Sequence, residues 1–347
     1  AIESFTRNFG VPSLNRDVRD LAEDEKQLSH FLDSLSGYEP HKPLILIGCA
    51  PCQGFSAHRK KNWNSKDKRN NLLVDFASIA IKLSPVAIVM ENVPELLSQK
   101  YWSYFTETRD VLEKAGYIVK QSIYNSASFG VPQARFRAIM IAMKRDFLLP
   151  EPIYDSSEYV TVQEAIGGLP AVFPGEVISG DRLHRSANHR PSTLEVIHSV
   201  PKDGGNRPRG VGPACLDRVK GFSDVYGRLS WDQPAVTITR YARNPASGRF
   251  IHPVQNRGLT AREAALLQSF PYNFEFTGSF DSIFKQIGEA VPPRMACAIA
   301  ATVFVGLSAT REPTERENEG SLSSITEPIS NSYSGIIAAH ERRRCKK

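Results

Sequence analysis

The sequence has few cysteines, no internal repeat and no long apolar run. Only five of its 347 residues are cysteine, and their spacing is uneven, which argues against the disulfide framework of small secreted domains. No segment resembles a signal peptide, and no apolar run is long enough to predict a membrane span. These absences favour a protein of a reducing cytoplasm, without a membrane, whose cysteines are free thiols.

The composition is that of an ordinary globular protein. Hydrophobic residues make up 41% of the chain and charged residues 23%, so a chain of this length can bury one large core or two modest ones. Lysine and arginine outnumber aspartate and glutamate by 43 to 37, which gives a net charge of +6. An excess of this size permits an anionic partner without establishing one.

Short apolar runs alternate with helical periodicity over the first 150 residues. Strands that alternate with helices predict an α/β fold with a mostly parallel sheet and helices on both faces. Ligands of such sheets bind at the carboxyl ends of the strands, and two polar motifs of this sequence lie there. We expect strands at 44–48, 86–90, 117–124 and 138–143, and helices at 72–83 and 98–115.

The rest of the chain is less regular. Residues 151–250 are rich in Pro, Gly, Arg and His and have weak periodicity, which predicts a small loop-rich domain separate from residues 1–150. Residues 251–307 regain helical patterns, including a capping box that opens at Thr260, and are expected to return to the first domain. The polar segment 308–347 has few large apolar residues and is expected to be a disordered tail.

Cys49 and Cys52 form a C-x-x-C pair directly after the strand expected at 44–48. A redox disulfide or half of a zinc site could have the same spacing. A zinc site needs a second ligand pair, but the other three cysteines are isolated and the histidines between 184 and 198 lack finger spacing, so no metal is expected. A redox role stays open as an alternative, and the simplest interpretation of Cys49 is a buried residue at a strand end.

Six short motifs, taken together, carry more information than the cysteine pair. They are PCQGFS (51–56), ENVPEL (91–96), QARFR (133–137), RLSWDQPAVTITR (228–240), REAALLQSFP (262–271) and QIGEAVPP (286–293). In this order they closely resemble the cytosine-5 DNA methyltransferase family of bacterial type, and the likeness extends from about residue 8 to residue 307. The resemblance implies a Rossmann-like methyltransferase domain, formed by 1–150 and 251–307, with a target-recognition domain at 151–250.

The chemistry of cytosine methylation agrees with two residues of these motifs. C5 of cytosine is a poor nucleophile until another group adds at C6, and a thiolate is suited to that reversible addition. The resemblance assigns this role to Cys52. A carboxyl group held against N3 would stabilise the charge that develops there and would distinguish cytosine from thymine, and Glu91 fits that role.

Basic residues surround the predicted nucleophile in two places. Arg135 and Arg137 alternate with apolar neighbours, so both guanidinium groups are expected on one face of an extended segment, where they suit a base carbonyl, a phosphate or a carboxylate. The resemblance implies that Arg137 helps to hold the cytosine and the catalytic loop. The loop 54–71 carries six lysines and arginines around Trp63, as expected of a segment that closes over DNA from which a base has been flipped.

The resemblance also implies S-adenosylmethionine as the methyl donor. Asp17 and Val18 match positions that meet its adenine, and Leu72 matches a later position lining the same pocket. Glu289 stands where the family more often has asparagine, and the following Val291 belongs to an intact VPP. The Gly-rich turn and the acidic residue that hold the donor in this family have no counterpart in the sequence, so the N-terminal strands of the sheet are expected to be missing.

Three explanations of that difference follow: a truncated fragment, an enzyme whose partner chain supplies the donor loop, or a decayed protein. The expected function is transfer of a methyl group to C5 of a flipped cytosine in specific double-stranded DNA sequences. The setting would be a bacterial restriction-modification system or an orphan enzyme acting on the nucleoid in the cytoplasm. The alternatives are an inactive or partner-dependent DNA-binding remnant and a tRNA methyltransferase, whose relatives usually depart from PCQ.

Overall fold

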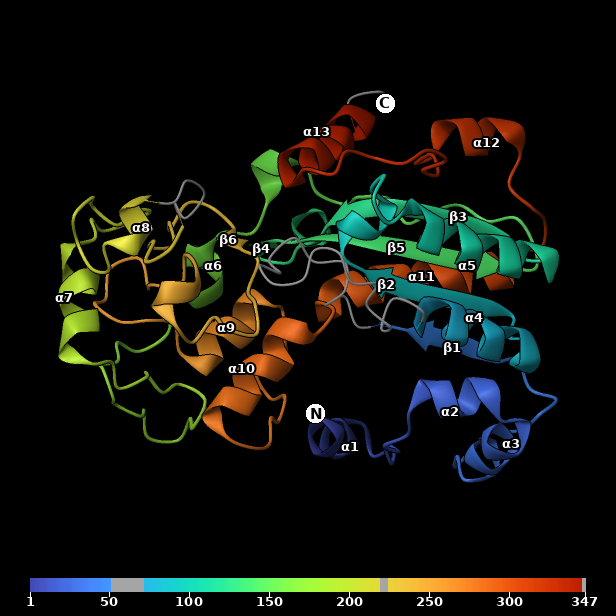
Figure 1. Ribbon diagram of the computed structural model, residues 1–347, viewed down its shortest axis with the longest axis horizontal. Coiled ribbons are helices and arrows are strands. Elements are labelled where there is room, and N and C mark those ends of the chain that lie inside the picture. The colour runs from blue at the N-terminus through green and yellow to red at the C-terminus, as the bar shows by residue number, and fades with distance from the viewer. Residues whose placement is uncertain (51–71, 219–223, 345–347) are drawn as a thin grey trace. The chain divides into compact units, whose positions relative to one another are not determined.

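The computed structural model describes residues 1–50, 72–218 and 224–344 (Figure 1). Cys52 and the basic loop 54–71 therefore lie outside the described residues. The chain forms two compact units, which we name by their content. The sheet unit consists of residues 11–124, 136–152 and 297–347, and the loop-rich unit of residues 1–10, 125–135 and 153–296.

A four-stranded sheet forms the centre of the sheet unit. β1 runs parallel to β2, whereas β2 and β5 are antiparallel, so β5 is the exception in a sheet expected to be mostly parallel. Only residues 126–135 separate β3 from β5, which is too short for the crossover that parallel neighbours require. In spatial order the strands are β1 (Ile45–Gly48), β2 (Ala87–Asn92), β5 (Phe136–Met143) and β3 (Ile118–Asn125).

Helices cover one face of this sheet because their apolar positions recur at helical spacing. Leu73, Ala77 and Ala80 of α4 (Leu72–Leu83) are buried with Ile88 and Met90 of β2. The predicted bounds of α4 are confirmed, and α5 (Trp102–Lys114) ends before a glycine at φ +85°, as the sequence indicates. The sheet unit has three further short helices: α2 (Val18–Glu23), α3 (Glu25–Asp33) and the 3-10 helix η3 (Pro94–Leu97).

The opposite face is covered by α11 (Pro293–Ser308), which lies behind the strands in Figure 1. A Cβ at Gly306 would lie 3.2 Å from the Met143 side chain, so helix and sheet approach closely there. The strand register places Ile47 on the face of Met143, yet Ile47 is 69% exposed, as are Phe304 and Val305 of α11, at 60% and 69%. Among the described residues no strand pairs with the outer edge of β1. This corner of the sheet unit is therefore apolar and open.

The loop-rich unit has a core of its own. Side chains of α9 and α10, such as Leu267 and Phe284, are buried with Val162 and Leu229, which is why residues 251–296 join this unit instead of returning to the sheet as expected. The alternating polar and apolar segment 235–241 forms a strand only at its first two residues, which pair with β4. The elements are α1 (Ile2–Phe9), η4 (Ser126–Phe129), β4 (Gln133–Ala134), η5 (Ser156–Glu158), α6 (Val162–Ile166), α7 (Pro191–Ser199), α8 (Cys215–Arg218), β6 (Ala235–Val236), η6 (Pro245–Ser247), α9 (Ala261–Leu267) and α10 (Phe280–Glu289).

The segment 308–347 is ordered over the residues that the structure describes, so the predicted disordered tail is wrong. It contains α12 (Glu315–Gly320) and α13 (Tyr333–Arg344). Ile325 and Ile336 are 2% and 0% exposed and belong to the core beside α4 and α5. A few isoleucines, dispersed among many polar residues, are enough to anchor the segment, and the average composition conceals them.

The stretch Phe280–Ser308 is long and apolar enough to cross a membrane by length and composition alone, although the sequence pattern predicted no span. It consists of α10 and α11 with a short connection between them. Ile283, Phe284 and Val303 of this stretch are buried within the protein. Core helices of soluble proteins meet the same criterion, so the stretch is weak evidence for a membrane location.

Candidate active site

The carboxyl ends of β1 and β2 lie side by side and bring the first site residues together. Gly48 pairs with Met90, so the residues that follow each strand emerge at the same edge. Asn92, 3% exposed, donates from Nδ2 to the carbonyl of Ala50 at 3.3 Å, while its Oδ1 accepts from Val93 N at 2.8 Å. Asn92 thus ties the backbone just before Pro51 and Cys52 to the end of β2, a role that the sequence did not reveal.

Glu91 forms a partly buried ion pair with Arg137. The Glu91 Oε1 to Arg137 Nε distance is 2.7 Å, and the two side chains are 16% and 13% exposed. Glu91 stands opposite Ile139 in the β2–β5 register, and Arg137, two residues before Ile139, shares its face. Arg137 also donates from Nη1 to the carbonyl of Phe136 at 2.7 Å. The guanidinium therefore fixes one oxygen of the carboxylate and its orientation.

Arg135 has a different role from the one predicted. β4 ends at Ala134 and β5 begins at Phe136, so the regular alternation that would have placed Arg135 beside Arg137 is interrupted. The Arg135 side chain is buried and donates to the carbonyls of Ile238, Gly288 and Ala290 at 3.1 to 3.2 Å. Its guanidinium joins backbone segments of the loop-rich unit, and the expectation of a shared face is wrong.

Cys49 is poorly suited to nucleophilic chemistry. Desolvation by the surrounding protein, with a smaller effect of the negative charge of Glu91, raises the pKa of its thiol to about 12, although part of the side chain is exposed. At neutral pH only on the order of one molecule in 10⁵ would carry the thiolate there. The expectation that Cys49 is fully buried is wrong, since its strand-end position leaves one side open.

Three of the predicted donor-site residues lie where α2 and α4 pack together. Asp17 caps α2, accepts from Arg19 N at 3.0 Å and pairs with its guanidinium. These hydrogen bonds hold the pKa of Asp17 at about 2. Val18 packs in the cluster with Ile79 of α4, and Leu72, half-buried, is the first residue of α4. An ionised acceptor beside apolar side chains is chemically suited to the amine and ring of an adenine.

The other two predicted donor-site residues belong to the loop-rich unit. Glu289 ends α10 and pairs with Arg240 at 2.7 Å, and Val291 is half-buried just beyond it. No described residues form a Gly-rich turn aimed at a donor. Gly48 ends β1, but a Cβ there would lie 2.6 Å from the Phe76 ring, so this glycine makes room for Phe76. The described residues therefore fit the adenine end of S-adenosylmethionine and provide no cradle for its other end.

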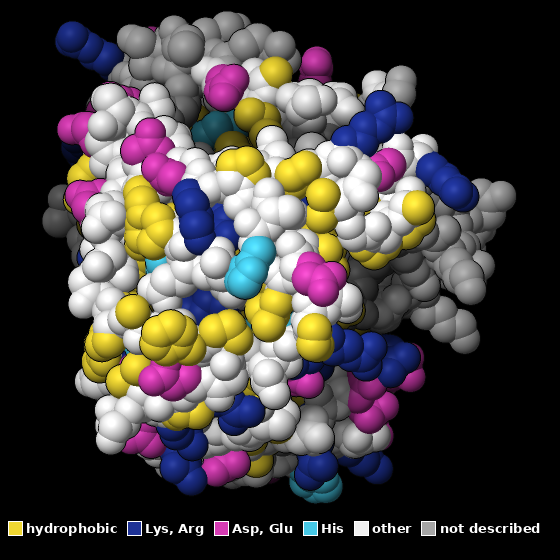
Figure 2. All heavy atoms as spheres, turned by 90° about the vertical axis from the view of Figure 1, so that its left-hand side faces the viewer, with side chains coloured by type: hydrophobic (Ala, Val, Ile, Leu, Met, Phe, Trp, Pro, Cys, Tyr) yellow, Lys and Arg dark blue, Asp and Glu magenta, His cyan; other side chains and the backbone are white. Residues whose placement is uncertain are grey.

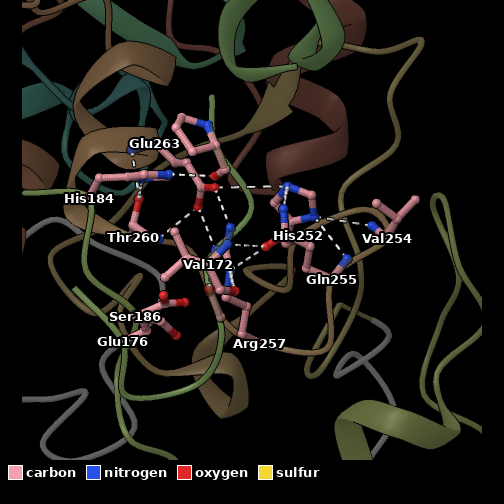
Figure 3. A network of polar contacts seen from close by, with 12 residues as sticks. Val172, Glu176, His184, Ser186, His252, Val254, Gln255, Arg257, Thr260 and Glu263 are labelled. Atoms are coloured by element: carbon pink, nitrogen blue, oxygen red, sulfur yellow. Dashed lines mark hydrogen bonds and ion pairs between the residues drawn. The ribbon is translucent and has the colours of Figure 1, made fainter. Parts of the chain in front are cut away.

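A buried network of charges in the loop-rich unit organises the start of α9 (Figure 3). Arg257 and Glu263, 0% and 1% exposed, form a bidentate pair at 2.6 and 2.8 Å. Burial opposes ionisation of Glu263, but the hydrogen bonds and charge of Arg257 hold its pKa below the usual value. The predicted capping box at Thr260 is confirmed, and His184 hydrogen-bonds with Thr260 at 3.1 Å. The sequence predicted the cap but not the buried ion pair.

His252 gives this network a measurable pH dependence. Its Nδ1 accepts from the backbone of Val254 and Gln255, and burial lowers its pKa to about 4. In the unfolded chain it would titrate near 6.5, so the unfolded state binds more protons between these values and stability falls as pH falls. We expect the free energy of unfolding to lose about 2 to 3 kcal/mol between pH 7 and pH 4.5 through His252.

Urea unfolding of the protein and of His252→Gln at pH 7 and pH 4.5 measures this contribution. Each protein gives a change in the free energy of unfolding between the two pH values, and the difference between the two changes is due to residue 252. Glutamine retains an oxygen that can accept from the same backbone amides. The variant should lose less stability on acidification than the unsubstituted protein. Equal losses in both proteins would contradict the assignment.

A third buried arginine organises the loops around α7. Arg228, 0% exposed, binds the carbonyls of Ile197 and Val200 at the end of α7, and those of His252 and Gln255. The loops of this unit are thus held by internal hydrogen bonds in place of long regular elements. Figure 2 shows one face of the molecule, on which basic side chains are interspersed with acidic and apolar ones.

Within the described ranges, no group of three or more His, Cys, Asp or Glu side chains is placed to hold a metal ion. In the network of Figure 3, Arg257 donates to both carboxylate oxygens of Glu263.

Comparison with known proteins gives consistent results. The sequence model for C-5 cytosine-specific DNA methylases matches residues 1–304. The type II methylase M.HgiDII of Herpetosiphon aurantiacus is 35% identical over 294 residues, which are 80% of this chain and 81% of the relative. The type II methyltransferase M1.HphI of Haemophilus parahaemolyticus is 37% identical over 276 residues, 78% of this chain and 71% of the relative.

Among solved structures, one described as a DNA modification methyltransferase encoded within a prophage of E. coli has the same fold. The TM-score is 0.66 at 22% identity, and the alignment covers 89% of this chain and 90% of that one.

Proposed function

Because this chain belongs to the C-5 cytosine-specific DNA methylase family, we propose that it transfers the methyl group of S-adenosylmethionine to C5 of a flipped cytosine in specific duplex sequences. The observation that carries the proposal is the Glu91–Arg137 pair at the end of β2, beside the Asn92 tether that leads to Cys52. The relatives in type II restriction-modification systems support a bacterial enzyme that works on DNA in the cytoplasm.

In this proposal the Cys52 thiolate adds to C6, and the electron pair of the C5–C6 bond makes C5 nucleophilic. The Glu91 carboxyl, oriented by Arg137, must carry a proton on the oxygen that faces N3. In that protonated form it donates a hydrogen bond to N3 and stabilises the charge that develops there. S-adenosylmethionine, when bound, supplies a methyl group attached to a sulfonium. When C5 takes the methyl group, the sulfur keeps the electron pair of the broken bond and leaves as a neutral thioether. Loss of the C5 proton and departure of the Cys52 thiolate restore the ring.

The site must reach an atom that lies inside a duplex, so the cytosine has to leave the stack. We propose that the basic loop 54–71, which lies outside the described residues, and the loops of the loop-rich unit contact the DNA. The interspersed charges in Figure 2 suit a surface that reads grooves more than one that binds phosphates alone.

We also propose that a further polypeptide segment, joined to this chain or separate, completes the donor side. The open edge of β1 has backbone groups that can pair with an added strand. Ile47 on β1 is an exposed apolar side chain, as are Phe304 and Val305 of α11, the helix that covers the same face of the sheet. A segment with a Gly-rich turn after that strand would bring backbone amides to the donor, which no described residue does.

The test uses duplex DNA of mixed sequence that contains [5-³H]cytosine. Addition at C6 followed by proton exchange at C5 releases tritium to water without any donor, so it reports the cytosine side alone. We expect tritium release by this chain, and methyl transfer from labelled S-adenosylmethionine when a polypeptide carrying the Gly-rich segment is added. Absence of tritium release, or release from tRNA and not from DNA, would refute the activity. Equal methyl transfer with and without the added polypeptide would refute only the proposal for β1.

A further inference from the structure

The C-terminal segment follows the edge of the sheet opposite to β1. We name residues 322–340 the C-terminal strap. Ile325 N donates to the carbonyl of Gln121 on β3 at 2.9 Å, and Gln121 N donates to Ser324 Oγ at 3.1 Å. Gln121 also donates from its side chain to the carbonyl of Ile325. The strap is therefore bonded to the backbone N–H, the backbone carbonyl and the side chain of Gln121 on edge strand β3.

The strap then holds the turn that follows the Glu91 motif. Ile329 N donates to the carbonyl of Leu97, the last residue of η3, at 2.9 Å, and Gln99 N donates back to the carbonyl of Ile329 at 3.1 Å. Lys100 N donates to Asn331 Oδ1 at 3.0 Å. η3 begins two residues after Asn92. The backbone of residues 97–100, just after the Glu91 motif, is thus held by residues more than 200 positions away.

The end of the strap reaches the residue before Arg137. In α13, Ile336 is fully buried in the core that contains Leu96 and Leu97. His340, 8% exposed, donates from Nδ1 to the carbonyl of Ile123 at 3.0 Å. Its ring stands edge-on to that of Phe136, with centroids 5.4 Å apart. The carbonyl of Phe136 accepts from Arg137, so His340 supports the residue that orients the guanidinium.

We propose that the C-terminal strap is a positioning element that holds Glu91 and Arg137 in the geometry needed for attack on cytosine. The inference rests on the proposed function. The strap lies beyond residue 304, where the match to the family model ends, and it supports both partners of the pair: Glu91 through η3, and Arg137 through Phe136. A shift of about 1 Å in such a pair can lower a rate about a hundredfold, even when the residue causing it is remote.

The decisive variant is Ile329→Pro, which removes the N–H that binds Leu97. Its matched control is Ile329→Ala, which trims the side chain and keeps the N–H. We expect kcat for tritium release to fall about tenfold or more in Ile329→Pro, with KM for DNA within twofold. Ile329→Ala should stay close to the unsubstituted protein. Glu317→Ala, which removes the exposed pair with Arg311 and the capping hydrogen bonds to Thr314 at the start of α12, all outside the strap, should leave kcat unchanged.

A second measurement reads the ion pair directly and needs no activity. The NMR resonance of the Arg137 Nε–H, assigned by its loss in Arg137→Lys, should shift or broaden in Ile329→Pro and stay in place in Ile329→Ala and Glu317→Ala. An unchanged resonance and unchanged kcat in folded Ile329→Pro would overturn the inference, as would equal effects of both Ile329 variants. If the unsubstituted protein releases no tritium, the proposed function fails, and the resonance alone decides whether the strap positions the pair.

Discussion

Cys52→Ala is expected to abolish tritium release from [5-³H]cytosine in duplex DNA, by at least about a thousandfold, whereas Cys49→Ala should retain it within about twofold. Without addition at C6, C5 has no route to proton exchange, and removal of a covalent nucleophile has effects of this size. Cys49 stands three residues away, but its pKa of about 12 leaves it almost entirely protonated at neutral pH.

The control for this pair is DNA binding, which both variants should retain because neither residue is expected to contribute to affinity. With 5-fluorocytosine in place of cytosine and a bound donor, the adduct cannot release a proton from C5 and is trapped. A protein–DNA conjugate that forms with Cys52→Ala and not with Cys49→Ala would reverse the assignment.

Glu91→Gln is expected to lower the rate of tritium release by about 10² to 10⁴, the usual range for a general acid. Glutamine keeps the shape of the side chain and an oxygen that can accept from Arg137, so the loss would reflect the missing acid and not a collapsed site. Urea unfolding should show similar stability for both proteins.

Substitutions of Arg137 separate orientation from charge. Arg137→Lys keeps the positive charge but lacks the planar fork that contacts Glu91 and the Phe136 carbonyl together. We expect an intermediate rate for Arg137→Lys and a lower one for Arg137→Ala. A rate in Glu91→Gln equal to that of the unsubstituted protein would remove Glu91 from the mechanism, whatever the Arg137 variants do.

Local periodicity predicted the regular parts of the fold. The helix at 72–83 and the strand that contains Glu91 are confirmed, and their apolar residues are buried by neighbours close in the sequence. The strand that precedes Cys49 also forms, although Ile47 is exposed. The antiparallel direction of β5 was not predicted, since strand direction depends on how the chain connects strands in space. The order of Cys52, Glu91 and Arg137 in the motifs gave the candidate site, but not the break at Arg135 that separates two similar arginines.

The contacts that support the site were beyond prediction for a physical reason. Asn92 binds a carbonyl 42 positions earlier, and His340 binds one 217 positions earlier. Single polar residues carry no periodic signal, so only the folded chain shows that they meet. The tail was misjudged in the same way, because Ile325 and Ile336 are buried by strands and helices formed far upstream.

The strap follows the elements that it contacts by more than 200 positions, which sets the order in which the sheet unit can be completed during synthesis. Its hydrogen bonds to Gln121, Lys100 and Ile123 span 203 to 231 positions. Ribosomes add about 5 to 20 residues per second, so β3 and η3 wait on the order of 10 to 40 s for their partner. A nascent chain is therefore expected to keep an unpaired β3 edge, and a need for chaperones, until residues 322–340 emerge.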